Sequence, residues 1–413
     1  MAAMARPAAD PWRGRETIAL VTEDVFRLSS RFAQMKSSPV RDILAVLGRG
    51  DIISFAGGIP DPTLFELTDF RESFAHVLEQ QGARALQYAS TIGEPELREQ
   101  AAQRLCRHLP TTAGQVQVTS GSQEGLYLVA TTLVDPGDVI LVERPTYLTA
   151  VQAFTLVGAR MVGVDSDEYG MMPDALADAI ETHDPKLVYL VPTFQNPTGH
   201  TMSAERRAAI AEVLVRAGVP LLEDDPYGEL RFEGAPLPPI AAQPGMARQT
   251  VLLNSASKVM APGVRIGWLR AEGQMLRSLE IAKQGVGLQT AVTDQLAIAH
   301  YLATYDLDAH IARVADVYRV RRDAMLASLD ARLPEGATAT RPEGGMFVWV
   351  RLGGDVDSAK VLPRAVDRGV AFVPGWPFYA NNPDRTTMRL SFVTNSPETI
   401  GEGVGRLAAA WGW

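Results

Sequence analysis

From residue 116 onwards, short apolar runs rich in β-branched residues alternate with segments long enough to form helices. The runs are nearly continuous in apolar residues, which is typical of parallel strands whose two faces are both buried. This alternation predicts an α/β layered domain over about residues 60–300. The predicted strands cover 116–118, 139–142, 160–164, 187–191, 219–223 and 250–254.

The sequence on either side of this region has a different texture. Residues 1–30 are polar and contain prolines, so we expect a loose arm there. Helical patterns cover about 31–50, 66–108 and 291–330, and strand patterns return at 344–352, 370–375 and 387–393. We therefore expect an N-terminal arm at 1–30, a large domain at 61–300, and a smaller α+β domain formed by 31–60 and 301–413.

The composition excludes several classes of protein. The chain carries a formal net charge of −9 over 413 residues, and an acidic chain repels phosphate backbones, so no nucleic-acid partner is expected. No apolar stretch approaches the roughly 18 residues of a membrane span, and no apolar run follows the N-terminal arginines as in a secretory signal. The single cysteine, Cys106, fits a reducing compartment. These features together lead us to expect a cytoplasmic protein. The histidines form no HExxH or HxxxH pair, so no metal site is expected.

Polar residues gather where the predicted strands end. Ligands of open α/β sheets bind at the carboxyl ends of the strands, so these segments together predict a binding site. In the first of them a Gly-Ser turn precedes a helix start, whose free N–H groups and dipole favour a phosphate. Neither glycine-rich nucleotide motif, GxxxxGK[ST] or GxGxxG, is present. The segments are VTSGSQEG (118–125), LVPTFQNPTGH (190–200), LLEDDPYGEL (221–230) and NSASKVMAPGVRIGW (254–268).

Taken singly, each of these segments has a simpler interpretation. A serine at a helix start is an ordinary N-cap, Asp224 fits a helix cap, and Arg265 fits an ion pair. Lys258 fits a solvated lysine, but only five of the 39 basic residues are lysines, which makes a lysine in a serine-rich, apolar setting stand out. The joint occurrence of the segments at strand ends favours a functional site over these separate interpretations.

Three blocks carry a specific resemblance: S-x-S-K-x-x-x-P-G-x-R (255–265), N-P-T-G (196–199) and D-x-x-Y (224–227). Over roughly residues 31–413 the chain resembles the fold-type-I, class I/II aminotransferases that depend on pyridoxal 5′-phosphate (PLP). The resemblance implies an α/β fold with a central, mostly parallel sheet between helices in the large domain, plus a smaller α+β domain. It also implies PLP as the cofactor.

The same resemblance assigns the chemistry. Lys258 matches the lysine that carries PLP as a Schiff base and that, once released, moves the proton between the substrate Cα and the cofactor. Asp224 matches the carboxylate that keeps the pyridine nitrogen protonated, so that the ring acts as an electron sink. Tyr227 and Asn196 match the groups that hydrogen-bond the phenolic oxygen of the ring.

Further matches surround the cofactor. Tyr147 matches the aromatic residue that stacks on the pyridine ring, where aspartate aminotransferases have a tryptophan. Tyr88 matches a tyrosine that reaches the phosphate in the neighbouring subunit, which implies a homodimer with shared active sites. The residues that match the phosphate cup are Ser122, Gln123, Ser255, Ser257 and Arg265.

The substrate side of the site matches as well. Arg389 matches the arginine that binds the substrate α-carboxylate, Gly58 matches the backbone that closes over it, and the resemblance also assigns Asn196 to substrate binding. SFAGGIPDPTLF, LQYASTIG, GGMFVW and FVPGWPFY resemble the 2-aminoadipate/kynurenine-type subgroup. In that subgroup an arginine on a mobile N-terminal helix holds the distal carboxylate of the substrate. Arg41 falls at that position, and an ordinary surface arginine is the alternative interpretation.

The resemblance therefore implies an aminotransferase that exchanges the amino group between an L-amino acid and a 2-oxo acid such as 2-oxoglutarate. The amino acid would be 2-aminoadipate-like, aromatic, or branched or long in its side chain. A PLP enzyme of specialised metabolism, with lyase, oxidase or cyclisation chemistry on the same fold, stays open as an alternative. A transcription regulator with an aminotransferase-like domain is disfavoured, because only about 30–40 residues precede the matching region.

Overall fold

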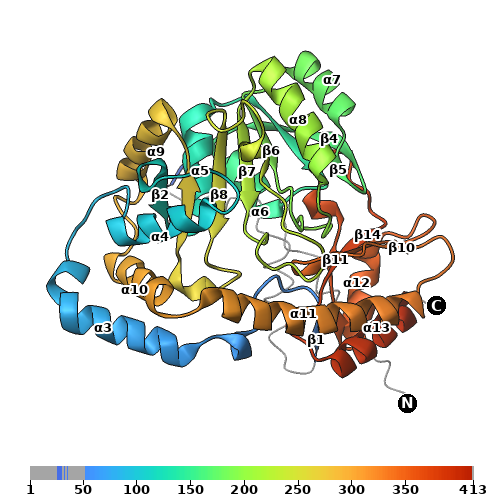
Figure 1. The fold of residues 1–413 in the computed structure, drawn as a ribbon. Helices are drawn as coiled ribbons and strands as arrows, with labels where there is room; N and C mark the ends of the chain where they lie inside the picture. Colours follow the sequence, from blue (N-terminus) through green and yellow to red (C-terminus); the bar gives the residue numbers. More distant parts are fainter. Residues whose placement is uncertain (1–25, 30–31, 33–34, 36–51, 412–413) are drawn as a thin grey trace.

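A large sheet sandwiched between helices dominates the molecule (Figure 1). The structure is a computed structural model that describes residues 26–29, 32, 35 and 52–411. Most of the predicted arm at 1–30, the helical pattern at 31–50 and Arg41 lie outside the described residues.

The large sheet has eight strands in the order β2-β9-β8-β7-β6-β3-β4-β5. The strands β8, β7, β6, β3 and β4 are parallel neighbours, whereas β9 runs antiparallel between β2 and β8, and β5 runs antiparallel to β4. The predicted mostly parallel sheet is thus confirmed. The strands are β2 (Val116–Thr119), β3 (Val139–Arg144), β4 (Arg160–Asp167), β5 (Gly170–Met171), β6 (Leu187–Leu190), β7 (Leu221–Asp225), β8 (Thr250–Ser255) and β9 (Gly267–Arg270).

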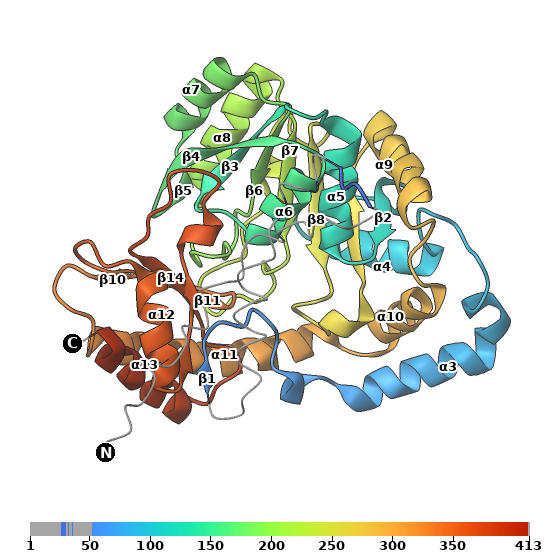
Figure 2. The same cartoon turned by 180° about the vertical axis from the view of Figure 1, so that it is seen from behind.

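Both faces of this sheet are buried. Successive side chains of a strand point to opposite faces. In β3, Ile140 and Val142 accordingly pack in one apolar cluster, and Leu141 packs in a second one. The helices that follow the strands cover the two faces (Figures 1 and 2): α5 (Ser122–Leu133), α6 (Leu148–Leu156), α7 (Pro173–His183), α8 (Ala204–Ala217) and α9 (Gly273–Val286).

Two long helical patterns are each divided into two helices. The pattern at 66–108 forms α3 (Leu67–Ala85) and α4 (Pro95–Leu105), because Gly93 at φ 109° lies between them and Pro95 starts a new helix. The pattern at 291–330 forms α10 (Val292–Thr304) and α11 (Leu307–Asp330). The Asp306 side chain accepts a hydrogen bond from Ala309 N at 3.0 Å and so caps α11, which ends the preceding helix.

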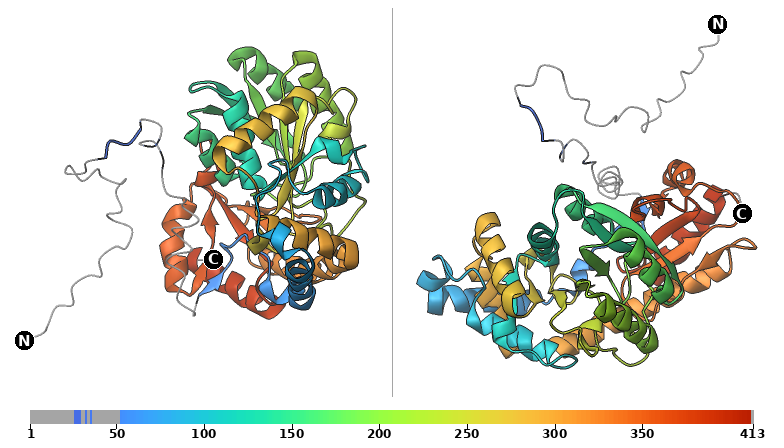
Figure 3. Two further views of the ribbon diagram at one scale, coloured as in Figure 1. Left: turned by 90° about the vertical axis from the view of Figure 1, so that its left-hand side faces the viewer. Right: turned by 90° about the horizontal axis from the view of Figure 1, so that it is seen from above.

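A smaller sheet of four strands occupies the C-terminal part, in the order β10-β11-β14-β13, and the side views show it next to the large sheet (Figure 3). The short strand β1 (Ile53–Ser54) pairs in parallel with β12 (Val370–Ala371), so the N-terminal segment lies with the C-terminal part. This pairing supports the grouping of 31–60 with 301–413, although the domain boundaries stay a prediction. The remaining elements are β10 (Thr338–Ala339), β11 (Phe347–Arg351), β13 (Val373–Pro374), β14 (Thr387–Ser391), α12 (Ser358–Asp367) and α13 (Pro397–Trp411).

The described residues also limit what else the chain contains. None of the helices in that part of the chain carries an apolar stretch that would cross a lipid bilayer. Within the same residues, no three His, Cys, Asp or Glu side chains gather as the ligands of a metal ion would.

Candidate active site

The predicted site residues follow strands whose carboxyl ends meet at one edge of the large sheet. Asn196 lies at the centre of the group, in the loop after β6. Its Nδ2 atom donates to the Tyr227 hydroxyl at 3.4 Å, and its Oδ1 accepts from the Arg389 guanidinium at 2.8 Å. One asparagine therefore joins a residue of the large sheet region to Arg389, which β14 supplies from the smaller sheet.

The segment Ala56–Gly58 binds both an arginine and a lysine. Arg389 donates through its second terminal nitrogen to Ala56 O at 2.8 Å, and Lys258 Nζ donates to Gly58 O at 2.9 Å. A Cβ atom added to Gly58 would lie 3.0 Å from the Phe347 ring and 3.8 Å from the Arg389 guanidinium. Glycine at this position therefore leaves the arginine open to a ligand next to the lysine amine.

Burial changes the acid–base properties of both cations. The pKa of Lys258 is lowered to about 8, first because burial disfavours its charged form and then because Arg389 and Arg265 repel it. Burial also lowers the pKa of Arg389 to about 10, so it keeps its charge at neutral pH. The Arg389 guanidinium lies 4.2 Å from the centre of the Phe347 ring, whose face stabilises the cation.

Asp224 has one carboxylate oxygen with a partner and one without. The side chain is only 2% exposed, and its Oδ2 accepts a hydrogen bond from the Tyr189 hydroxyl at 2.9 Å. Its Oδ1 has no hydrogen-bond partner, and burial raises the pKa of this carboxyl to about 7. Because buried polar atoms are normally satisfied, this oxygen fits the N–H group of a cationic ring such as a protonated pyridine.

The turn between β2 and α5 provides a cradle for an anion. Gly121 has φ 82°, and a Cβ at that position would lie 2.6 Å from the Arg265 guanidinium. Arg265 in turn donates to Ser120 O at 2.9 Å, next to Ser122, which begins α5. A guanidinium beside the free N–H groups of a helix start fits a phosphate.

The other residues predicted to contact the cofactor lie in three separate segments. Ser257 N donates to Ser255 Oγ at 3.1 Å, which keeps these serines in one turn after β8. Gln123 directs its amide nitrogen to Thr149 O at 3.4 Å. Tyr147 is the N-cap residue of α6, shortly after β3, and burial raises the pKa of its hydroxyl.

Two predicted residues are not part of this group. Tyr88 is 77% exposed, on the loop between α3 and α4, and takes no part in the hydrogen bonds of the described site. Arg41 lies outside the described residues. A contact of Tyr88 with a neighbouring subunit is compatible with its exposure.

A family model described as aminotransferase class I and II matches residues 51–407. The chain belongs to this family. It is similar to aromatic-amino-acid aminotransferase 1 of Thermococcus litoralis, with 41% identity over 92% of this chain and 93% of the relative. The resemblance seen in the motifs is thereby confirmed, and the fold-type-I architecture is confirmed by the solved structures that follow.

Two solved structures are similar along almost the whole aminotransferase chain. The kynurenine aminotransferase of Pyrococcus horikoshii, crystallised with PMP, has a TM-score of 0.88 and 39% identity over 93% of this chain and 96% of that one. An alpha-aminoadipate aminotransferase of Thermus thermophilus, complexed with N-(5′-phosphopyridoxyl)-L-leucine, has a TM-score of 0.86 and 36% identity over the same shares. This aminotransferase is a PLP-dependent enzyme.

Tyr189 contacts Asp224, one of the predicted site residues, and was not among the residues that the sequence predicted. It lies in β6, is fully buried, and belongs to the apolar run LVYLV. A buried tyrosine hydroxyl needs a partner, and here Asp224 on the adjacent strand β7 accepts its hydrogen bond. A tyrosine in the middle of a buried strand is the signal that the sequence offers.

Replacing Tyr189 by phenylalanine is expected to weaken PLP binding by about tenfold, because a hydrogen bond to a charged group contributes about 1.5 kcal/mol. Titrating the apoenzyme with PLP and following intrinsic fluorescence measures this. Tyr301→Phe is the matched control, since that ring is equally buried but stacks on Phe70 at 5.0 Å. Equal affinity of the two variants would mean that the Tyr189 hydroxyl does not hold Asp224.

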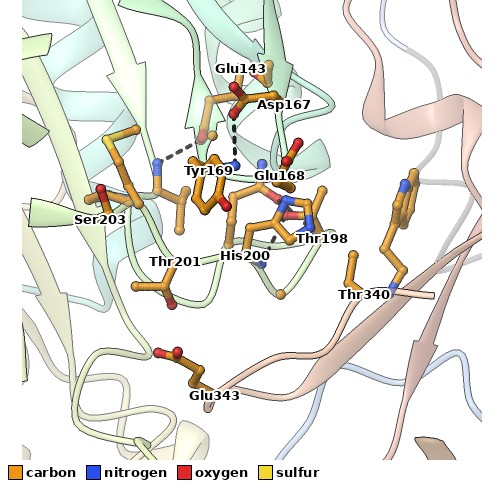
Figure 4. Close-up of a pocket in the computed structure, with 18 of the residues that line it drawn as sticks. Glu143, Asp167, Glu168, Tyr169, Thr198, His200, Thr201, Ser203, Thr340 and Glu343 are labelled. Atoms are coloured by element: carbon orange, nitrogen blue, oxygen red, sulfur yellow. Dashed lines mark hydrogen bonds between the residues drawn. The ribbon is translucent and has the colours of Figure 1, made fainter. Parts of the chain in front are cut away.

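A cleft of about 1010 Å³ lies beside the loop that carries Asn196 (Figure 4). Its lining includes His200 and Glu143, but not Lys258, Asp224 or Arg389. Glu143 is 3% exposed, and its Oε2 accepts from Val191 N at 3.0 Å. Burial raises the pKa of this carboxyl to about 8, and the hydrogen bonds from Val191 and Gln195 oppose that rise only in part.

Replacing Glu143 by glutamine is expected to stabilise the protein increasingly, relative to wild type, as the pH rises from 5 to 8. The folded pKa of Glu143 lies above its unfolded value of 4.5, so wild type loses stability as the pH rises towards about 8. Glutamine does not ionise and avoids this loss. Melting temperatures at three pH values measure the difference. Glu168→Gln, which changes an exposed carboxylate of the same cleft, is the control, and a stability difference for Glu143→Gln that does not change with pH would contradict the prediction.

Proposed function

We propose that this enzyme transfers the amino group between an L-amino acid with a long, branched, aromatic or 2-aminoadipate-like side chain and a 2-oxo acid such as 2-oxoglutarate. The names of the similar proteins support this substrate range, because they include an aromatic-amino-acid, a kynurenine and an alpha-aminoadipate aminotransferase. This substrate range is proposed, whereas membership of the aminotransferase family is shown.

The observation that carries the proposal is that Arg389 and Lys258 both donate hydrogen bonds to carbonyl oxygens of the segment 56–58. Arg389 bonds Ala56 O, and Lys258 bonds Gly58 O. An α-amino acid has its carboxylate on the carbon that must lose a proton. A carboxylate-binding cation and a proton-accepting amine, both hydrogen-bonded to carbonyl oxygens of one short segment, match this arrangement.

The residues of the chain have distinct roles in this proposal. Arg389 binds the substrate carboxylate and fixes the orientation of Cα, with Gly58 giving it access. Lys258, whose pKa of about 8 leaves a neutral fraction near physiological pH, takes the Cα proton and returns it at the other end of the transfer. Asp224 holds a negative charge in the interior against the ring nitrogen of the cofactor.

PLP supplies an electron-withdrawing ring that stabilises negative charge at the substrate Cα. Lys258 and Asp224 would hold its ring, Tyr227 and Asn196 its phenolic oxygen, and Tyr147 its face. The phosphate would be held by Ser122, Gln123, Ser255, Ser257 and Arg265, with the cradle at Gly121 as the supporting observation.

A panel of amino donors tests the reaction. Purified enzyme is incubated with 2-aminoadipate, kynurenine, leucine, phenylalanine and tyrosine, each with 2-oxoglutarate, and glutamate formation is measured. Turnover with at least one donor, and conversion of bound PLP to its pyridoxamine form by that donor alone, are expected. Release of ammonia or peroxide without the pyridoxamine form would support lyase or oxidase chemistry instead.

Arg41 decides between acidic and apolar side chains in this proposal. If it holds a distal carboxylate, Arg41→Ala should raise KM for 2-aminoadipate and leave KM for leucine unchanged. Equal changes for both donors would assign Arg41 to the surface.

We further propose a cytoplasmic homodimer in which Tyr88 reaches the phosphate of the partner's cofactor. The exposure of Tyr88 supports this, and the single cysteine supports a reducing compartment. If each site combines Lys258 of one subunit with Tyr88 of the other, then a mixture of Lys258→Ala and Tyr88→Ala proteins contains hybrid dimers with one intact site. Activity above that of either variant alone is expected, together with a dimer mass in sedimentation equilibrium. A monomer mass would refute the shared site.

A further inference from the structure

Among the lysines that the structure describes, Lys283 is fully buried. It occupies the last turn of α9 and has no exposed surface. The chain has only five lysines, and Lys258 is assigned to the cofactor. An ammonium group removed from water costs several kcal/mol unless charge and hydrogen bonds compensate it, so its surroundings need an explanation.

Two side chains compensate Lys283. Its Nζ donates to Glu124 Oε2 at 2.6 Å and to Thr290 Oγ1 at 2.9 Å. Glu124 lies in the first turn of α5, and the same Oε2 atom accepts from Ser120 N at 2.6 Å. Glu124 Oε2 thus links the Lys283 ammonium to the backbone of the turn between β2 and α5.

This turn is the cradle for the cofactor phosphate in the proposed function. Arg265 binds Ser120 on its carbonyl side at 2.9 Å, and Glu124 binds it on its N–H side. The turn is thereby held from both sides, and its direction determines where the N–H groups of Ser122 and Gln123 point. The pair of Glu124 and Lys283 acts on the side that faces away from Arg265.

The same lysine holds a second segment. Its Nζ donates to Thr290 Oγ1, and its backbone carbonyl oxygen accepts from both Gly287 N and Leu288 N at 3.0 Å, at the start of the segment that leads to Thr290. In this segment the Gln289 side chain accepts from Ala89 N, next to Tyr88. Replacing the Lys283 side chain would therefore remove one contact of the turn, through Glu124, and one contact of this segment, at Thr290, while the backbone hydrogen bonds of residue 283 stay.

A buried ion pair contributes little to stability when compared with an apolar pair of the same shape. Two apolar side chains in place of Glu124 and Lys283 would fill the space, but they would leave Ser120 N without an acceptor. The geometry therefore favours a role in positioning over a role in stability.

We propose that Lys283 is a positioning residue for the phosphate of the cofactor: through Glu124 it fixes the Ser120–Ser122 turn in the arrangement that receives a phosphate. This inference rests on the proposed phosphate cup at Arg265 and the start of α5. It predicts that Lys283 affects ligands that carry the phosphate and leaves ligands without it unaffected.

The test compares PLP with pyridoxal, which has the same ring and aldehyde but no phosphate. Apoenzyme of Lys283→Met is titrated with each ligand, and the dissociation constants are compared with those of wild type and of Lys186→Met, an exposed lysine at the opposite end of β6. We expect the dissociation constant of PLP to be about tenfold or more higher for Lys283→Met than for wild type, and that of pyridoxal to be unchanged. Lys186→Met should bind both ligands like wild type. Equal weakening of PLP and pyridoxal, or no weakening, overturns the proposal.

Three further variants keep the outcome decisive. Glu124→Gln keeps an oxygen for Ser120 N while it removes the charge, and Glu124→Gln combined with Lys283→Met removes both ions, so a folded protein is available if Lys283→Met alone fails to fold. The double variant is expected to bind PLP as weakly as Lys283→Met does, with pyridoxal unchanged, because the lysine that holds the residue 124 side chain is absent; wild-type PLP affinity in the double variant overturns the proposal. Arg265→Ala separates the two proposals: if it binds PLP like wild type, the phosphate cup itself is wrong, whereas if it loses affinity and Lys283→Met does not, only the role of Lys283 is wrong.

Discussion

Replacing Lys258 by alanine is expected to abolish covalent attachment of the cofactor and to reduce turnover by about 10⁴-fold or more, since both a covalent contact and an acid–base group are removed. The side chain is the amine that lies against Gly58 in the group around Arg389. The absorbance of bound PLP, and mass spectrometry after borohydride reduction, measure attachment, and glutamate formation measures turnover.

Lys186→Ala is the control for this experiment, because Lys186 is exposed and lies at the start of β6. It should keep both the label and the turnover. A Lys258→Ala protein that still carries a borohydride-fixed cofactor on another lysine would refute the assignment, and with it the proposed mechanism.

Asp224→Asn is expected to lower kcat/KM by about 10²–10³-fold, the range observed when one oriented electrostatic contact is removed. Asparagine has nearly the same shape but no charge, so the ring nitrogen of the cofactor would lose the anion that keeps it protonated. The cofactor dissociation constant should rise as well. Steady-state kinetics at saturating PLP, together with absorbance of the bound cofactor across pH, measure both effects.

Glu223→Gln is the matched control for Asp224→Asn. Glu223 is the neighbouring residue of β7, is equally buried, and accepts from Ile240 N at 2.8 Å and Ala241 N at 2.9 Å. Its replacement places an amide against one of these N–H groups and should cost about 1–3 kcal/mol of stability. The folded Glu223→Gln protein should keep kcat/KM near wild type, and an equal loss in both variants would count against a special role for Asp224.

The sequence was sufficient for residues that lie in short motifs at strand ends. Asp224, Asn196 and Lys258 each follow a buried apolar run, and strand ends meet at one edge of a parallel sheet, so their proximity was predictable. The position of Arg389 could not be predicted from strand ends, because Arg389 lies in β14 of the other sheet. Its role was predicted only from the resemblance to the family.

The missed features depend on contacts that no local pattern records. Tyr189 and Lys283 lie within an ordinary apolar strand and an ordinary helix, and only tertiary packing places them beside Asp224 and Glu124. Strand β9 was also missed, because four residues after a Pro-Gly turn give too short a pattern. The break at Asp306 was missed because one capping side chain interrupts an otherwise continuous helical periodicity.

The antiparallel strand β9 has a consequence for how the protein opens and closes. Ser255 of β8 pairs with Gly267 of β9, and Ala256 N donates to Ile266 O at 3.1 Å, so the intervening residues form one closed loop. Lys258 and Arg265 both belong to this loop, so one hairpin carries the residues proposed to bind the aldehyde and the phosphate of the cofactor. Local openings of a protein occur in cooperative units of about this size. If Lys258 and Arg265 both contact PLP, hydrogen exchange should slow in β8 and β9 together when PLP is added to the apoenzyme.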